Sequence, residues 1–233
     1  MKAVVATLAV LGFIINASIA NAWGPGPVTC SNQTISDGST VAQVTVPRNT
    51  SCTLTNVTVT GSVRVEQGAS LTIDPLGTQQ VTIDNNLTAN GCKTVVLGIQ
   101  SNHSQITIGN NVRVQNCTGD VSLAKTITVG GNVACSGNAQ CVIEDIVIQG
   151  NLSVDNNGSS TNTLNLITGV TVGGNVDFSG NIAHGVLSRS NVINDTTIGG
   201  NLSCFNNNVP ANNGGSPGSV VVSGNTSGQC VGL

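Results

Sequence analysis

Three segments of the chain repeat nearly the same string around a Gly-Gly-Asn corner. They read ITVGGNVACSGN (residues 127–138), VTVGGNVDFSGN (170–181) and TTIGGNLSCFNN (196–207). Weaker copies extend in both directions, so that one corner position recurs every 19 to 26 residues. These corner positions are Ser62 (a degenerate copy), Asn86, Asn111, Asn132, Asn151, Asn175, Asn201 and Asn225. Self-similarity at such a period is typical of proteins that stack one structural unit on the next.

Each repeat contains three short segments with the alternation of a β-strand. The first precedes the corner, and its copies are residues 57–59, 81–83, 106–108, 127–129, 146–148, 170–172, 196–198 and 220–222. The second follows the corner, with copies that include residues 63–65, 112–114, 133–135, 152–154, 176–178 and 202–204. The third is less regular and includes residues 71–73, 95–97, 121–123 and 164–166.

Strands of about three residues need to stack on their own copies, one coil away, at a spacing of about 4.8 Å. The sequence therefore predicts an all-β solenoid, a parallel β-helix of about eight coils of about 23 residues with three short strands per coil. We expect Gly to supply positive φ at the corner, and the corner Asn to tolerate the left-handed region and to hydrogen-bond to its copies. A β-sandwich is the alternative, but it does not explain a repeated corner.

The chain has eight cysteines, all beyond its apolar N-terminal segment. An even number favours disulfides formed in an oxidising compartment. Metal binding is the alternative, but there is no C-x-x-C and only two His. Cys92 and Cys117 each lie six residues past a corner Asn, so the register places them in adjacent coils. The predicted pairs are Cys30–Cys52, Cys92–Cys117, Cys135–Cys141 and Cys204–Cys230.

The N-terminus has the pattern of a secretory signal peptide. Lys2 precedes an apolar run from Ala3 to Ile19, and Ala20-Asn21-Ala22 is an A-x-A cleavage site. A membrane anchor is the alternative, but the run is short and lacks a basic stop-transfer flank. We therefore expect a secreted, extracellular protein.

The expected organisation has four parts. They are a signal peptide (1–22), an N-terminal cap and first coil (23–56), the β-helix coils (57–215), and a C-terminal coil and cap (216–233). Solenoid ends expose an open strand ladder, so Trp23–Asp37 and Ser216–Leu233 are expected to cover them.

With three strands per coil and Asn corners, the chain resembles right-handed parallel β-helix proteins of the pectate-lyase-like superfold. Its C-terminal part, GGNLSCFNNNVPANNGGSPGSVVVSGNTSGQC (Gly199 to Cys230), is similar to the closing repeats of a group of secreted microbial proteins that end in G-N-L-x-C, G-N and G-Q-C. The resemblance implies secretion and a right-handed β-helix. It transfers no activity.

Charge is sparse, with seven basic and ten acidic residues and a formal net charge of −3. We find no basic patch along the sequence, so nucleic acid is not an expected partner. No Lys/Arg-rich helix suggests attraction to a membrane surface once the signal peptide has been removed.

Catalytic signals are weak. The polygalacturonase motifs N-T-D and G-H-G are absent, and Glu144-Asp145 is the only acidic pair. Glu144, Asp155 and Asp177 are the best candidates for a catalytic or Ca²⁺ cluster, if they face one side in neighbouring coils. Solvated surface charges are the simpler interpretation. His103 and His184 are interpreted as solvated loop residues, and no cofactor or metal site is predicted.

One outward feature stands out in the first strand of each repeat. Its middle residue is Thr in six copies, namely Thr58, Thr82, Thr107, Thr128, Thr171 and Thr197. A flat Thr array on a β-solenoid can bind ice or a glycan. A second parallel Thr column is missing, and the high β-propensity of Thr explains a single column without function.

The sequence therefore predicts a secreted structural or surface-interaction β-helix without catalysis, whose partner would be a cell-wall or extracellular glycan. The first alternative is a lyase or hydrolase that acts on polysaccharides. The second is ice or glycan binding through the Thr column.

Overall fold

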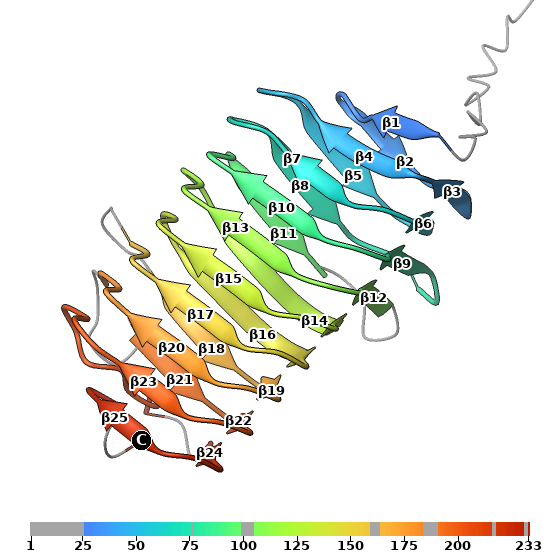
Figure 1. Cartoon of the computed structure of the whole chain (residues 1–233). Helices are drawn as coiled ribbons and strands as arrows, with labels where there is room; N and C mark the ends of the chain where they lie inside the picture. Colours follow the sequence, from blue (N-terminus) through green and yellow to red (C-terminus); the bar gives the residue numbers. More distant parts are fainter. Residues whose placement is uncertain are drawn as a thin grey trace, which may run out of the picture.

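The computed structural model describes residues 26–75, 77–98, 105–158, 164–183, 191–215, 218–230 and 233. In these ranges the chain is all-β and contains no helix. Its strands pile along one axis from the N-terminal to the C-terminal end (Figure 1). The predicted fold, a parallel β-helix, is confirmed. The predicted signal peptide and Trp23 lie outside the described residues.

One face of the β-helix is a ten-stranded parallel sheet built from the strands that follow the corner. In stacking order they are β1 (Pro27–Thr29), β4 (Gln43–Val46), β7 (Val63–Val65), β10 (Leu87–Asn90), β13 (Val112–Gln115), β15 (Val133–Ser136), β17 (Leu152–Asp155), β20 (Val176–Ser179), β23 (Leu202–Cys204) and β25 (Thr226–Gly228).

The register of this sheet follows the corner alignment. Leu87, one residue past Asn86, pairs with Val63 on one side and with Val112 on the other. The strands from β7 to β25 continue this register and correspond to the predicted coils. Two further strands, β1 and β4, precede them, so the coils begin within the segment expected to form a cap.

The other strands form a fifteen-stranded sheet that combines two stacks. The stack of first strands contains β3 (Ser39–Val41), β6 (Val57–Val59), β9 (Gln80–Ile83), β12 (Gln105–Ile108), β14 (Val121–Val129), β16 (Cys141–Ile148), β19 (Thr171–Val172), β22 (Thr196–Ile198) and β24 (Val220–Val222). The stack of third strands contains β2 (Gln33–Ile35), β5 (Ser51–Leu54), β8 (Ser70–Ile73), β11 (Thr94–Leu97), β18 (Asn165–Thr168) and β21 (Asn191–Asn194).

The long strands β14 and β16 belong to both stacks and join them. In β14 the chain bends at Lys125 and Thr126, which have φ of 59° and 51°, and the register with β16 shifts there. Asp145 makes the matching bend in β16, with φ of 52°. The strands predicted separately at residues 121–123 and 127–129 are therefore one strand with a bend between them.

The core consists of inward aliphatic side chains that meet their counterparts in the next coil. Val63, Leu87, Val112 and Val133 are adjacent members of one such row, and each is at most 1% exposed. A core of this kind needs few aromatic residues, because each coil buries the apolar face of its neighbours. Phe178 is the largest fully buried side chain.

The inward phase of one predicted strand was wrong. The sequence suggested Leu164 and Leu166 as inward residues, but Asn165 and Ile167 are the buried positions of this segment. Asn165 Nδ2 donates to Asn191 Oδ1, 3.2 Å away in the next coil. A shift of one residue exchanges the two faces of a strand. Because Asn165 is polar, the alternation of polar and apolar residues placed it on the outer face, and the predicted phase was therefore shifted by one residue.

The corner glycines have a different role from the one expected. Gly130 and Gly131 are not among the residues with positive φ. A Cβ at Gly131 would lie 2.7 Å from Asn111 Oδ1 in the preceding coil, and a Cβ at Gly130 would collide with the backbone oxygen of Gly109. Close approach between coils, rather than left-handed backbone, therefore requires glycine at this corner.

The corner Asn side chains bridge adjacent coils. Asn111 Oδ1 accepts from the backbone N–H of Asn132 at 2.9 Å and from its Nδ2 at 3.2 Å. Asn132 Oδ1 does the same for Asn151 at 2.8 and 3.0 Å. Backbone amides that point along the axis are thus satisfied by the coil before them.

Left-handed backbone occurs at a second corner, after the strands of the ten-stranded sheet. Asn and Gly alternate there in successive coils, as Asn116, Gly137, Asn156, Gly180 and Asn206, all with positive φ. A Cβ at Gly137 would lie 2.6 Å from Asn116 Oδ1. Each Asn side chain therefore occupies the space that the following Gly leaves open.

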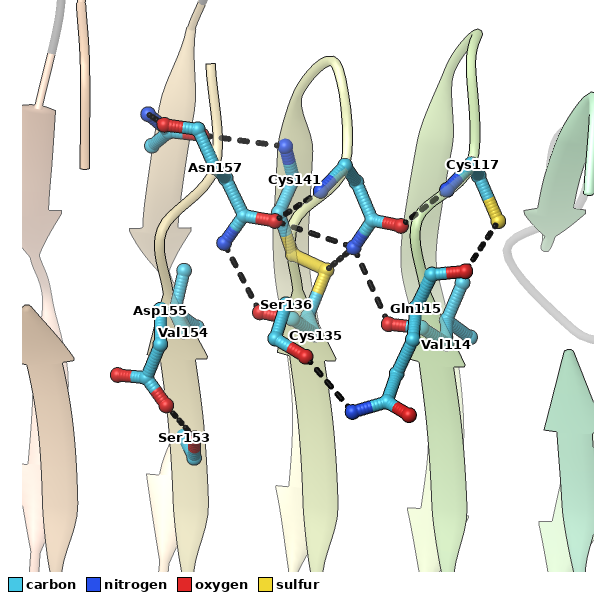
Figure 2. The surroundings of a disulfide bond; sticks show 12 residues. Val114, Gln115, Cys117, Cys135, Ser136, Cys141, Ser153, Val154, Asp155 and Asn157 are labelled. Atoms are coloured by element: carbon cyan, nitrogen blue, oxygen red, sulfur yellow. Dashed lines mark hydrogen bonds between the residues drawn. A yellow bond between two sulfur atoms is a disulfide. The ribbon is translucent and has the colours of Figure 1, made fainter. Parts of the chain in front are cut away.

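A buried column of amides follows this second corner and was missed in the sequence. Its members are Asn138, Asn157, Asn181 and Asn207, each at most 5% exposed. Asn157 Oδ1 accepts from Asn138 N at 3.0 Å and from Asn138 Nδ2 at 3.1 Å. Asn157 Nδ2 donates to Cys135 O at 2.9 Å, beside the disulfide (Figure 2).

All four predicted disulfides are confirmed, as Cys30–Cys52, Cys92–Cys117, Cys135–Cys141 and Cys204–Cys230. Three of them join adjacent coils, and Cys135–Cys141 closes a bend within one coil. The chain among the described residues has no free cysteine.

The Asn157→Ala variant tests the buried amide column. It removes the acceptor of the buried Asn138 backbone N–H and one donor to the Cys135 carbonyl, so we expect a loss of about 3 kcal/mol in the free energy of unfolding. Urea denaturation measures it. Asn110→Ala is the control, because Asn110 is exposed and its side chain makes one 3.4 Å hydrogen bond; it should change stability by less than about 0.5 kcal/mol. Equal losses would contradict the role of the column.

Comparison of Gly137→Ala with Gly77→Ala separates two contributions to the loss of stability, the steric clash of a new Cβ and the strain of a positive φ. Both glycines have positive φ, at 66° and 63°, but a Cβ at Gly77 meets nothing within 4 Å. We expect Gly77→Ala to cost about 1 kcal/mol and Gly137→Ala clearly more, because its Cβ displaces Asn116. Thermal and urea unfolding of both variants check the order, and the reverse order would refute the alternating Asn–Gly packing.

Candidate functional site

Two of the three candidate acids lie together on the outer face of the ten-stranded sheet. Asp155 is on β17 and Asp177 is on the adjacent β20, where Asp177 pairs with Ser153 and Asp155 pairs with Ser179. Glu144 lies on β16 of the other sheet, opposite Ala124 and Thr168. The structure therefore brings Asp155 and Asp177 near each other but does not bring Glu144 to them.

A serine hydroxyl accompanies each of these two carboxylates. Ser153 Oγ donates to Asp155 Oδ2 (Figure 2), and Ser179 Oγ donates to Asp177 Oδ1. Partial burial raises the pKa of Asp155 above its ordinary value, and the negative charge of Asp177 adds to this rise. Hydrogen bonds from the Ser153 hydroxyl and the Ser179 backbone oppose it.

Asp155 and Asp177 form a small acidic patch on the outer surface of the sheet. In the ranges that the structure covers, no group of three or more His, Cys, Asp or Glu residues could hold a metal ion. His103 and His184 lie outside the described residues. The geometry can offer a proton from a carboxyl of raised pKa, but it adds no third ionisable group to the pair.

The Thr column forms one row on the fifteen-stranded sheet, as the register predicted. Thr58, Thr82, Thr107 and Thr128 pair in succession, and Thr171 pairs with Thr197. Thr40, at the N-terminal end, extends the row. Val147, which is 45% exposed, interrupts the row between Thr128 and Thr171, and Val221, which is 51% exposed, ends it after Thr197.

The row is one residue wide. On β12 and β14 the outward position two residues after Thr107 and Thr128 is Gly109 and Gly130, and the backbones of these glycines are in close contact between coils. A flat second column of hydroxyls therefore has no place to form here.

A hollow of the described surface lies beside β7, β10 and β13 and the turn that follows β4. It is an open groove of about 720 Å³. Arg64 projects from β7 and Arg113 from β13, while Arg48 follows the end of β4. Thr88, on β10, pairs with Arg64 on one side and with Arg113 on the other.

These arginines are available to a ligand. All three side chains are exposed, and no other described residue forms a hydrogen bond or an ion pair with them. Glu66 is the one acidic residue in the groove wall. Three of the chain's seven basic residues therefore gather in one groove.

This groove corrects the sequence-based view that the chain has no basic patch. Arg48 and Arg113 are 65 positions apart, but stacking places them a few strands from each other. A signal was present in the repeats Val63-Arg64-Val65 and Val112-Arg113-Val114, in which the Arg occupies the same position. Charge counted along the chain could not reveal it, because the charges meet only across coils.

No protein-family model, curated protein or solved structure matches this chain. Within the described ranges, no helix has the length and apolar character that crossing a membrane requires.

The pH dependence of stability tests the environment of Asp155. Its pKa is raised above 3.8 in the folded state, so the folded chain holds this proton more tightly than the unfolded chain does. The free energy of unfolding should therefore fall as pH rises from about 3.8 through the raised value. Asp155→Asn should remove that fall and be the more stable protein at neutral pH.

Urea midpoints measured across the acidic range check this prediction. Asp177→Asn should reduce the fall without abolishing it, because burial remains when the neighbouring charge is removed. Asp84→Asn, at an exposed position just after β9, is the control and should leave the fall in place. A fall that persists in Asp155→Asn would refute the assignment.

Proposed function

We propose that this protein is secreted and that it acts by non-covalent binding of an extracellular or cell-wall glycan, without catalysis. The signal-peptide pattern of residues 1–22 supports export. The four disulfides are consistent with an oxidising, extracellular environment.

The observation that carries the proposal is the rigid repetition of the outer surface. Outward side chains form straight rows at the strand spacing of about 4.8 Å. The rows are polar and held in place by the backbone ladder and the disulfides, so binding would immobilise few groups of the protein. A repeating surface suits a repeating polymer, because successive units of the polymer can meet successive rows.

A polysaccharide lyase or hydrolase is the second candidate. It is supported by Asp155 and Asp177, which lie on adjacent strands, and by the raised pKa of Asp155, since a proton donor in glycoside cleavage needs such a shift. The exposed position of Asp177 argues against it. Ice binding is not favoured, because the Thr row is narrow and interrupted.

The test uses the oxidised chain from residue 23 onward. We expect retention on at least one class of immobilised glycan, and no new reducing ends or unsaturated products from pectin, alginate or glycosaminoglycans. Product formation that is lost in Asp155→Ala or Asp177→Ala would establish the enzymatic alternative instead. Failure to bind any glycan would remove the proposal.

A further inference from the structure

We infer that the groove lined by Arg48, Arg64 and Arg113 binds an acidic glycan through its carboxylate or sulfate groups. This inference rests on the proposed function and adds the chemical class of the ligand and the site that holds it.

The spacing of the arginines defines a cradle. Arg64 and Arg113 occupy the same outward row with Thr88 between them, so their Cα atoms are roughly 10 Å apart, which is two strand spacings. The short Thr88 side chain leaves a depression flanked by two long ones. Arg48 reaches the same groove from the turn after β4.

The charges favour an anion. Three guanidinium groups face one open groove in which Glu66 is the only carboxylate, although the protein as a whole is acidic. Like charges placed two strands apart repel each other, and no described residue forms an ion pair with these arginines. Guanidinium groups bind carboxylate and sulfate oxygens through paired N–H donors, which a bound anion would use.

The groove favours a polymer of sugars over a single small anion or a nucleic acid. Its volume of about 720 Å³ exceeds that of one oxyanion. Asn90, Gln67 and Gln115 add amide groups to its lining. Asn90 Oδ1 accepts from Asn116 and Gln115 Nε2 donates to Ser136, so the Asn90 Nδ2 and the Gln115 Oε1 are the groups that can hydrogen-bond to sugar hydroxyls. No aromatic side chain lines it, whereas surfaces for single-stranded nucleic acid use aromatic side chains to stack bases.

The test compares two double variants of the oxidised protein. R64Q/R113Q removes two charges from the groove, and K93Q/K125Q removes two charges outside it, so both variants have the same net charge. Binding to immobilised heparin (sulfated) and polygalacturonate (carboxylated) is measured as Kd, with dextran as the neutral glycan and a single-stranded DNA oligonucleotide as the competing polyanion.

We expect wild type and K93Q/K125Q to bind at least one acidic glycan with similar Kd. R64Q/R113Q should bind about tenfold more weakly or worse, because each charge-assisted hydrogen bond is worth roughly that factor. Binding by wild type should also weaken as salt is raised. R64K/R113K, which keeps the charges but loses the paired donors, should be intermediate.

Other results would overturn the inference. Equal weakening in both double variants would show that net charge, and not the groove, determines binding. Tighter, arginine-dependent binding of DNA would assign the groove to nucleic acid. Retention on dextran with no arginine dependence would refute the groove while leaving the proposed function intact, and binding to none of the glycans would refute both.

Discussion

The backbone hydrogen bond from one coil to the next is the interaction on which the rest of the structure depends. Parallel pairing fixes the distance between coils at about 4.8 Å, and each residue then lies directly above its counterpart. A side chain is therefore accommodated only if its counterparts can stack with it. Aliphatic residues do so in the core, and amides do so at the corners, where Asn111 Oδ1 accepts from both the backbone N–H and the Nδ2 of Asn132.

The same constraint explains why the surface has so little charge. Like charges directly opposite on adjacent strands repel, so an outward row favours neutral residues such as Thr. In the Arg64 row, Thr88 separates the two arginines, and in the Asp177 row the neighbours are Ser153 and Ser203. A charged group on this surface therefore has neutral neighbours within its row. At the groove, Arg64 and Arg113 are one residue of the row apart, and Arg48 joins them from the turn after β4.

Alignment of the corner was enough to predict the coils, the strand phases of most repeats and the disulfides that join adjacent coils, because each of these follows from the register. Cys135–Cys141 was predicted from its position at the two sides of one bend. The sequence did not reveal which side-chain and backbone contacts form between adjacent coils. The glycines near Gly131 looked like residues of left-handed backbone, but they are required by close approach to the preceding coil. Asn165 looked outward because its burial depends on Asn191, a partner 26 residues away. Glu144 looked close to Asp155 because the alignment did not show that the two residues face different sheets.

The corner after the ten-stranded sheet links the core to the proposed binding groove. One inward column there contains Cys92 and Cys117 and continues with Asn138, whose Oδ1 accepts from Cys117 N at 2.9 Å. The backbone N–H groups at this corner point to the neighbouring coil and need a hydrogen-bond acceptor or a side chain that shields them. Amides do this in the C-terminal coils and a disulfide does it in the coils before them. That disulfide ties the turns that follow β10 and β13, the strands that carry Thr88 and Arg113. The covalent bond therefore holds the floor and one wall of the groove at a fixed spacing, so a ligand would meet arginines whose positions are set before it binds.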